Sequence, residues 1–329
     1  METCKSPRTV MRLAYRLACD TWPTYARKFS RHDFTLRQVF ACLVVREMLK
    51  LSYRKCEEFL RDSPDWLADI GLSRPPDHNT LWRAFGNLSS TRLVNRMLDV
   101  MSERFDERER LMPSSKPLTI DSTCYERRHR SRHYDRVCRK MGLREGEKYV
   151  KTPEQRVETP AQVNRRRSRA VRQMPKLALA VASACHLILA AHARIGNGSD
   201  MPDFQPLLRR AGQRACVKTV VADAGYDSEM NHRAARQEMG VRSIIPPKIG
   251  RPSDKPPRGR YRRLMRQRFA RRADQKLYGQ RSQSETVNSM MKRNFGDALR
   301  SIKPKRRTQE MLLRSLTHDL MLLCNQDTG

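Results

Sequence analysis

The hydrophobic pattern of the chain changes at Pro113, and this change restricts the fold more than any other feature. Before it, apolar residues recur at helical spacing, and Thr35 with Gln38 three positions on forms a capping-box pattern at the start of one such run. After it, short runs of apolar and β-branched residues have the length of strands. The sequence therefore predicts an all-α N-terminal domain at residues 1–112 and a domain of mixed type at residues 113–329.

The predicted strands and helices after Pro113 follow a definite order. Apolar runs near residues 116–123, 176–184 and 186–196 predict three strands in succession. They are followed by a helix, a strand, a second helix and a fifth strand, and two more helices close the chain. This order indicates the α/β fold class, with a mixed sheet flanked by helices.

The N-terminal helices permit two interpretations. Short helices separated by basic turns are compatible with a helix-turn-helix-like reader of DNA. They are also typical of a plain helical bundle. We favour the bundle, because no single helix has the marks of a recognition helix.

The net charge of the chain is +32, with a sequence pI near 10.6. Such a charge favours a polyanionic partner, because each phosphate that a protein neutralises releases counterions. Residues 126–176 hold 17 Lys and Arg against 6 Asp and Glu, and residues 248–276 hold 12 against 2. Since the charge is concentrated in two segments of an otherwise ordinary globular sequence, it indicates nucleic acid rather than an anionic membrane surface.

The two basic segments are predicted to be insertions in the second domain, at about residues 126–176 and 246–276. Several prolines fall in the second of them, and we expect it to be a loop. In the first, four arginines are interleaved with His129 and His133, which are spaced as a possible metal pair. Phosphate contact is favoured over a metal there, because nearby cations disfavour a bound dication. The arginines predicted to contact DNA are Arg127, Arg128, Arg130 and Arg132.

The nine cysteines are scattered, without a C-x-x-C pair or a Cys/His cluster at zinc spacing. Neither a disulfide framework nor a zinc module is predicted, and the odd count favours a reducing compartment. The most apolar run, residues 177–193, is short for a membrane span. We therefore expect a cytoplasmic, nucleoid-associated protein with no membrane partner.

Two aspartates follow predicted strands. Asp121 comes at the end of the first strand and Asp223 at the end of the fourth, and ligand sites in open α/β sheets gather at such ends. Asp121 could instead cap the turn after its strand. That alternative is weaker for Asp223, because Asp227 and Ser228 are natural caps for the helix that follows.

A glutamate lies among basic and amide residues in the stretch YGQRSQSETVNSMMK. In a helix, Glu285 would share one polar stripe with Tyr278, Arg281 and Lys292, within an arc of about 60°. A solvated ion pair at i, i+4 explains the stripe by itself. The three acids Asp121, Asp223 and Glu285 together suggest more, because they could hold two Mg²⁺ ions, with Mn²⁺ as a substitute, for phosphodiester chemistry.

The spacing of this stretch resembles a known family signature. Tyr278, Arg281, Glu285 and Lys292 match the Y-(2)-R-(3)-E-(6)-K pattern of prokaryotic insertion-sequence transposases of the DDE type, in the insertion-sequence four/five-like superfamily. TIDST around Asp121 and ADAGYDS around Asp223 resemble the first and second acid motifs of that family. Segments in the N-terminal helices and in the last helix are also similar, so the likeness covers most of the chain.

The resemblance implies a ribonuclease-H-like core at about residues 113–329, with the three acids as ligands of the catalytic metals. It implies contacts of Arg281 and Lys292 with DNA near the cleaved phosphate, with Tyr278 as an accompanying contact or packing residue. The implied function is a transposase that binds the inverted-repeat ends of its element, as a homodimer on double-stranded DNA, and cuts and transfers strands. The alternatives are a nuclease of the same fold and a DNA-binding protein without catalysis.

Overall fold

The computed structural model describes residues 2–25, 32–88, 91–106, 111–127, 174–196, 198–247, 257–269 and 271–327. Its N-terminal region is helical, as predicted. The helices there are α1 (Pro7–Thr21), α2 (Leu36–Met48), α3 (Tyr53–Arg61), α4 (Pro64–Ala68), α5 (His78–Leu88) and α6 (Thr91–Asp106). The predicted capping box at the start of α2 is present, because Thr35 and Gln38 exchange side-chain and backbone hydrogen bonds.

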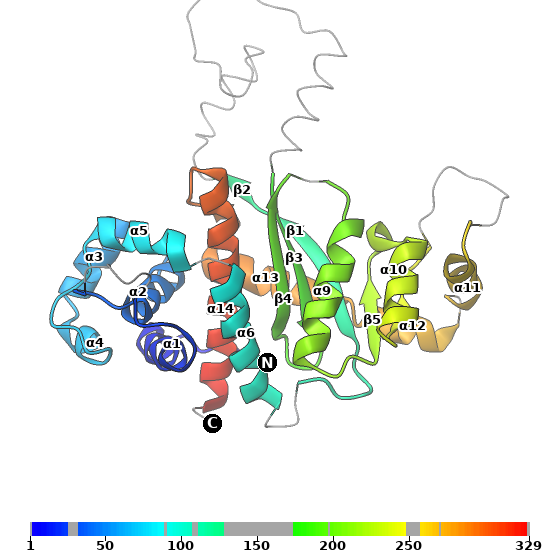
Figure 1. Ribbon diagram of the computed structural model, residues 1–329, viewed down its shortest axis with the longest axis horizontal. Coiled ribbons are helices and arrows are strands. Elements are labelled where there is room, and N and C mark those ends of the chain that lie inside the picture. The colour runs from blue at the N-terminus through cyan, green and yellow to red at the C-terminus, as the bar shows by residue number, and fades with distance from the viewer. Residues whose placement is uncertain are drawn as a thin grey trace, which may run out of the picture.

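A five-stranded sheet forms the centre of the rest of the molecule (Figure 1). Its strands are β1 (Leu118–Cys124), β3 (Pro175–Ala182), β4 (Ile188–Ile195), β5 (Thr219–Ala222) and β6 (Arg242–Ile244). The spatial order is β4-β3-β1-β5-β6, in which β4, β3 and β1 pair antiparallel and β1, β5 and β6 pair parallel. Two short strands, β2 (Glu126–Arg127) and β7 (Ala298–Leu299), form a separate parallel pair.

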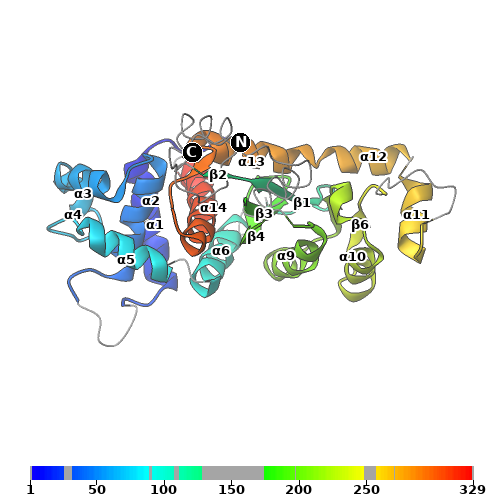
Figure 2. The same cartoon turned by 90° about the horizontal axis from the view of Figure 1, so that it is seen from above.

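Helices cover both faces of this sheet. They are α9 (Met201–Arg214), α10 (Glu229–Arg233), α11 (Arg260–Arg268), α12 (Arg272–Gly279), α13 (Ser282–Phe295) and α14 (Pro304–Asp327), with a 3-10 turn η1 (Ala224–Tyr226) and a π-helical turn η2 (Ala234–Glu238). Figure 2 shows α12 and α13 end to end along one side of the sheet, and α9 and α10 on the other. Three antiparallel strands, two parallel strands and helices on both faces are the ribonuclease-H-like α/β arrangement that was expected.

One hydrophobic core runs through the N-terminal helices and the sheet. The long helix α14 lies between them, where it packs against β4, α6, α1 and α2. The strands β3 and β4 are almost wholly apolar where they lie between helices, which explains why they read as continuous apolar runs. The domain boundaries 1–112 and 113–329 stay a prediction.

The structure corrects the prediction that the second basic segment is a loop. Residues 260–268 and 272–279 are the helices α11 and α12. The prolines that suggested a loop all precede Gly259, and beyond it apolar residues recur at helical spacing. Met265 is buried on that face and packs with the side chains of Val221 and Ile244.

Two smaller predictions are also corrected. Asp121 is not at the end of its strand, because β1 continues to Cys124; only the parallel pairing with β5 ends beside it. The polar stripe does not lie on one helix, since α12 ends at Gly279 and α13 begins after Arg281.

Candidate active site

The two aspartates lie side by side on neighbouring strands. In the parallel pairing of β1 with β5, Ile120 is opposite Ala222, and the next residues along the two strands are Asp121 and Asp223. Asp223 leaves the strand at the start of η1 and makes no capping hydrogen bond there with its side chain. Sheet register therefore brings together two acids that are about a hundred residues apart in sequence.

Asp121 lies in a partly buried position that disfavours its charge. Its pKa is raised to about 6, first because burial penalises the carboxylate and further because Asp223 and Glu285 add negative charge. Arg281 and the backbone N–H of Ser122 act in the opposite direction. The same three acids that were predicted from sequence therefore act on one another in the folded protein.

Helix α13 supplies the third acid and an amide. It packs against β1 and β3, with Val287 and Met291 fully buried beneath it. Glu285 lies on the exposed side of α13 and forms an ion pair with Arg281 at 2.6 Å. This is the i, i+4 ion pair that the sequence also predicted as an alternative to metal binding. Asn288 donates to the carboxylate of Asp121 at 3.5 Å.

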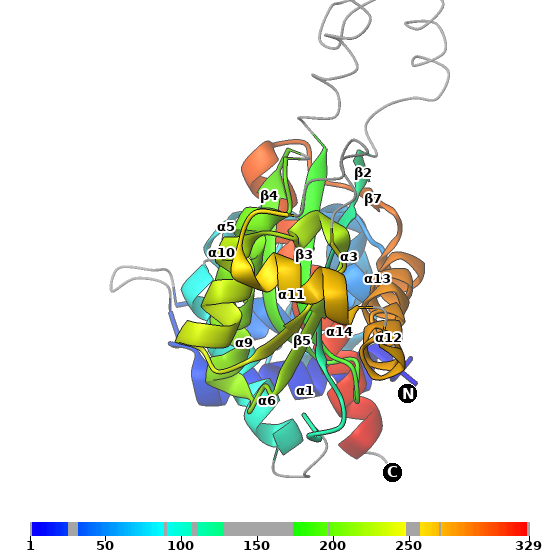
Figure 3. The same ribbon diagram turned by 90° about the vertical axis from the view of Figure 1, so that its right-hand side faces the viewer.

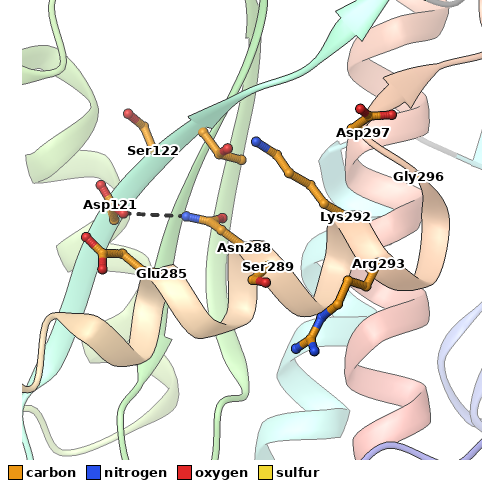
Figure 4. Close-up of a pocket in the computed structure, with 10 residues that line it drawn as sticks. Asp121, Ser122, Glu285, Asn288, Ser289, Lys292, Arg293, Gly296 and Asp297 are labelled. Carbon is orange, nitrogen blue, oxygen red and sulfur yellow. Dashed lines mark hydrogen bonds between the residues drawn. The ribbon is translucent and has the colours of Figure 1, made fainter.

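A pocket of about 600 Å³ opens between β1 and α13. Figure 4 shows Asp121, Glu285 and Asn288 grouped on one side of it, with Lys292 extending from α13 toward β1. The residues that line it are Asp121, Ser122, Thr123, Glu285, Asn288, Ser289, Lys292, Arg293, Gly296 and Asp297. The pocket thus combines two of the three predicted acids, Asp121 and Glu285, with basic and amide side chains, and Asp223 is not among the residues that line it.

The predicted basic and aromatic residues have different surroundings. Arg281 lies 5.8 Å from the centre of the Tyr278 ring, and the pKa of that phenol is raised by burial and by the negative charges of Asp223 and Asp121. Tyr278 also packs edge-on against Phe269, so part of its role is structural. Lys292 lies further along α13, where its amino group is 5.7 Å from the ring of buried Tyr125.

The acids fit a divalent cation in their chemistry. Mg²⁺ and Mn²⁺ take oxygen ligands, and a bound cation would favour the charged form of Asp121, whose pKa is raised by burial and by the neighbouring acids. Among the residues that the structure describes, no three acidic, histidine or cysteine side chains are close enough together to chelate a metal as they stand. Glu285 would have to exchange its contact with Arg281 for the ion.

Two groups near the site were not found from the sequence. Asn288 has a weak signal, because it lies three residues after Glu285 and therefore on the same side of a helix. Ser122 donates to Asp200 at 2.9 Å, and Asp200 also pairs with Lys176. Nothing in the sequence relates these three residues, which come from β1, the start of α9 and β3.

Some predicted residues fall outside the described part of the chain. They are Arg128, Arg130 and Arg132, together with His129 and His133. The backbone of Arg127 forms part of β2, but its side chain is not described. Among the described helices, none has both the length and the apolar character that crossing a membrane requires.

Comparison with protein families gives two matches. The family model described as Transposase DDE domain matches residues 117–320, more than half of the chain, and the one described as Transposase domain (DUF772) matches residues 14–87. A search of curated proteins gives no match. Enzymes with the DDE domain act on DNA in transposition and generally use divalent metal ions. The chain therefore belongs to the family of DDE transposases.

Proposed function

We propose that this transposase binds the inverted-repeat ends of an insertion sequence, cuts the DNA there, and joins the freed ends to target DNA. The observation that carries the proposal is the grouping of Asp121, Asp223 and Glu285, in which the charges of Asp223 and Glu285 act on the partly buried carboxylate of Asp121. A cluster of acids beside arginine and lysine is suited to holding cations and a phosphate together.

In this proposal Asp121, Asp223 and Glu285 hold two Mg²⁺ ions, and Mn²⁺ substitutes for them. Such ions, when bound, activate an attacking oxygen and stabilise the leaving oxygen at a phosphodiester. The protein's own contribution is to hold the three carboxylates on rigid elements. Asp121 lies on the central strand and Asn288 donates to it, which restricts its rotation.

Arg281 is proposed to change partner when DNA binds. It pairs with Glu285 in the structure, and a phosphate in the pocket offers it a second acceptor. Its release frees the Glu285 carboxylate to turn toward Asp121. Lys292, which lies on α13 with Glu285, is proposed to bind a phosphate of the DNA backbone beyond the phosphodiester that is cut. Tyr278 is proposed to hold Arg281 in position through the contact of its ring with the guanidinium group.

The same site is proposed to act twice. A water attacks the phosphodiester at the element end first, and the 3′ hydroxyl that is released then attacks the target strand in line. Because two ends are joined in one event, we propose a homodimer on DNA. Residues 1–112 are proposed as the domain that contributes to binding the ends, and Arg127, Arg128, Arg130 and Arg132 as further phosphate contacts.

The test is strand joining by the purified protein on a labelled duplex that contains the element end. With Mg²⁺ the wild type should give cleaved and joined products, and Glu285→Gln should bind the duplex normally and give neither. Cleavage without joining would identify a nuclease instead. Binding without either product in the wild type would identify a DNA-binding protein without catalysis, and joining by Glu285→Gln would exclude the assigned role of that residue.

A further inference from the structure

The helices α11 and α12 form a basic pair beside the edge strand β6, at the end of the molecule that faces the viewer in Figure 3. Their charged side chains fall into two groups, those that face the body of the protein and those that face solvent. The two groups have different partners, and this difference indicates what the outer surface binds.

The inward group fixes the helix pair to the protein. Arg262 donates twice to the buried carboxylate of Asp227, at 3.0 and 2.8 Å. Glu229, at the start of α10, accepts from the backbone N–H groups of Tyr261 and Arg262, and so caps α11 from another helix. On α12, buried Asp274 pairs with Arg242 of β6.

Gly259 is required for this attachment. Its φ is +103°, and a Cβ atom there would lie 2.2 Å from a carboxylate oxygen of Glu229. A side chain at this position would therefore meet both backbone strain and a collision with the group that caps α11. The attachment of α11 is specific, and its position on the protein is defined.

The outward group is entirely basic. Within residues 257–269 and 271–281, Asp274 is the one acidic residue, and it is buried. The exposed cations are Arg258, Arg260, Arg263, Arg266, Arg271, Arg272 and Lys276. Like charges at this density repel one another, and an anion that spans several of them relieves the repulsion.

The basic pair is joined to the candidate active site. Phe269 and Tyr278 pack at 5.1 Å, and Tyr278 in turn lies against Arg281. The segment from Arg272 to Arg281 covers roughly 13 Å at about 1.5 Å per residue, the length of about four base pairs of DNA. Phosphates bound at the pocket and on α12 and α11 can therefore belong to one continuous duplex.

We propose that the outer face of α11 and α12 binds the phosphate backbone of a DNA duplex about four or more base pairs from the phosphate that is cut. This inference rests on the proposed function, because it takes the pocket as the place of cutting. Its ligand is duplex DNA, which has two sources in the reaction, the element end and the target.

The experiment measures binding of two duplexes of equal length, one with the element end and one without it, over a range of salt concentrations. All proteins carry Glu285→Gln, so that no DNA is cut. The double variant Arg263→Ala/Arg266→Ala should lower the slope of log K against log salt by about 2, because two phosphate contacts are lost. The duplex that shows this loss identifies the source.

Two controls separate this effect from general loss of charge or of folding. Arg209→Ala/Arg233→Ala removes two exposed arginines from α9 and α10, on the side of the sheet away from α12, and should keep the full slope. Arg263→Lys/Arg266→Lys keeps both charges and should also keep it. An unchanged slope for the Arg263/Arg266 alanine pair on both duplexes, or an equal loss in the Arg209/Arg233 control, overturns the inference. Strand joining by wild-type protein is scored separately, so failure of the proposed function is recognised independently.

Discussion

Two clusters in this protein combine acids with arginines. Arginines outnumber the acids in one cluster, and acids outnumber the arginines in the other. In the first, between α2, β7 and α14, three arginines surround two glutamates, and every side chain is buried or nearly so. Its members are Arg46, Glu47, Arg300, Glu310 and Arg314. In the second, the groups that act on Asp121 are one arginine and two further acids.

Both glutamates of the first cluster have arginine partners. Arg314 pairs with Glu310 at 2.8 Å and donates to the carbonyls of Gly296 and Ala298, and Glu310 accepts from the backbone N–H groups of Arg300 and Ser301. Burial by itself would raise the pKa of Glu310, but these donors and Arg314 lower it overall. At Asp121 burial prevails and the pKa rises. Residue type therefore does not distinguish the two clusters, whereas the net effect of burial, donors and neighbouring charges on the pKa of the acid does.

The largest effect is expected from removing an acid of the second cluster. Asp121→Asn keeps the shape of the side chain but loses a proposed metal ligand, so strand cleavage should fall on the order of 10³-fold or more, the equivalent of several kcal/mol. The matched control is Asp297→Asn, an exposed acid that lines the same pocket. Equal rates of strand cleavage by Asp121→Asn and Asp297→Asn would contradict the proposed role of Asp121 as a metal ligand.

Arg314→Met tests the first cluster. It leaves Glu47 and Glu310 buried without one of the two arginines that they share, and the free energy of unfolding should fall by about 3–5 kcal/mol in urea titrations. The control Arg209→Ala removes an ion pair with Glu238 in which both side chains are about half exposed, and should cost less than about 1 kcal/mol. A similar loss of unfolding free energy in both variants would show that burial and pairing do not make this cluster stabilise the fold.

Arg281→Ala should have an intermediate effect. The loss of one phosphate contact should lower the salt slope of DNA binding by about 1 and reduce the cleavage rate by about tenfold. Thermal stabilisation by Mg²⁺ should persist, since the acids remain. Arg233→Ala, an exposed arginine on α10, serves as control, and a wild-type cleavage rate in Arg281→Ala would remove the proposed role of Arg281.

The smallest effect concerns the dependence of stability on pH. The pKa of Asp121 is about 6 in the folded protein against an ordinary value of 3.8, so the protonated carboxyl favours the folded state. This contribution is fully present below about pH 4 and is lost as the pH rises through 6. Asp121→Asn does not titrate, so its melting temperature should exceed that of the wild type by about 2 °C at pH 8 and converge with it near pH 4.

Melting curves at several pH values without metal measure this difference. Mg²⁺ at pH 8 should reduce it, because a cation stabilises the wild-type carboxylate and has no such effect on the amide. A difference that is constant from pH 4 to pH 8 would mean that the ionisation of Asp121 does not cause it.

Much of the fold followed from local patterns in the sequence. The capping box at Thr35 and the apolar runs that became β3 and β4 act within a few residues. Local propensity also placed Glu285 and Lys292 on α13. Asp223 could be selected because it follows the strand β5, whereas Asp121 was selected as a strand end although β1 continues beyond it.

What the sequence alone could not decide depends on contacts between distant residues. The helix α11 is capped by Glu229, some thirty residues earlier, and a basic run without its cap looks like a loop. The break between α12 and α13 and the position of Asp121 within β1 are set by packing against the sheet. The sequence determined which groups are present and the elements on which they lie. Only the tertiary structure decided which charges are buried together, and therefore at which acid burial raises the pKa and at which acid arginines and backbone donors lower it.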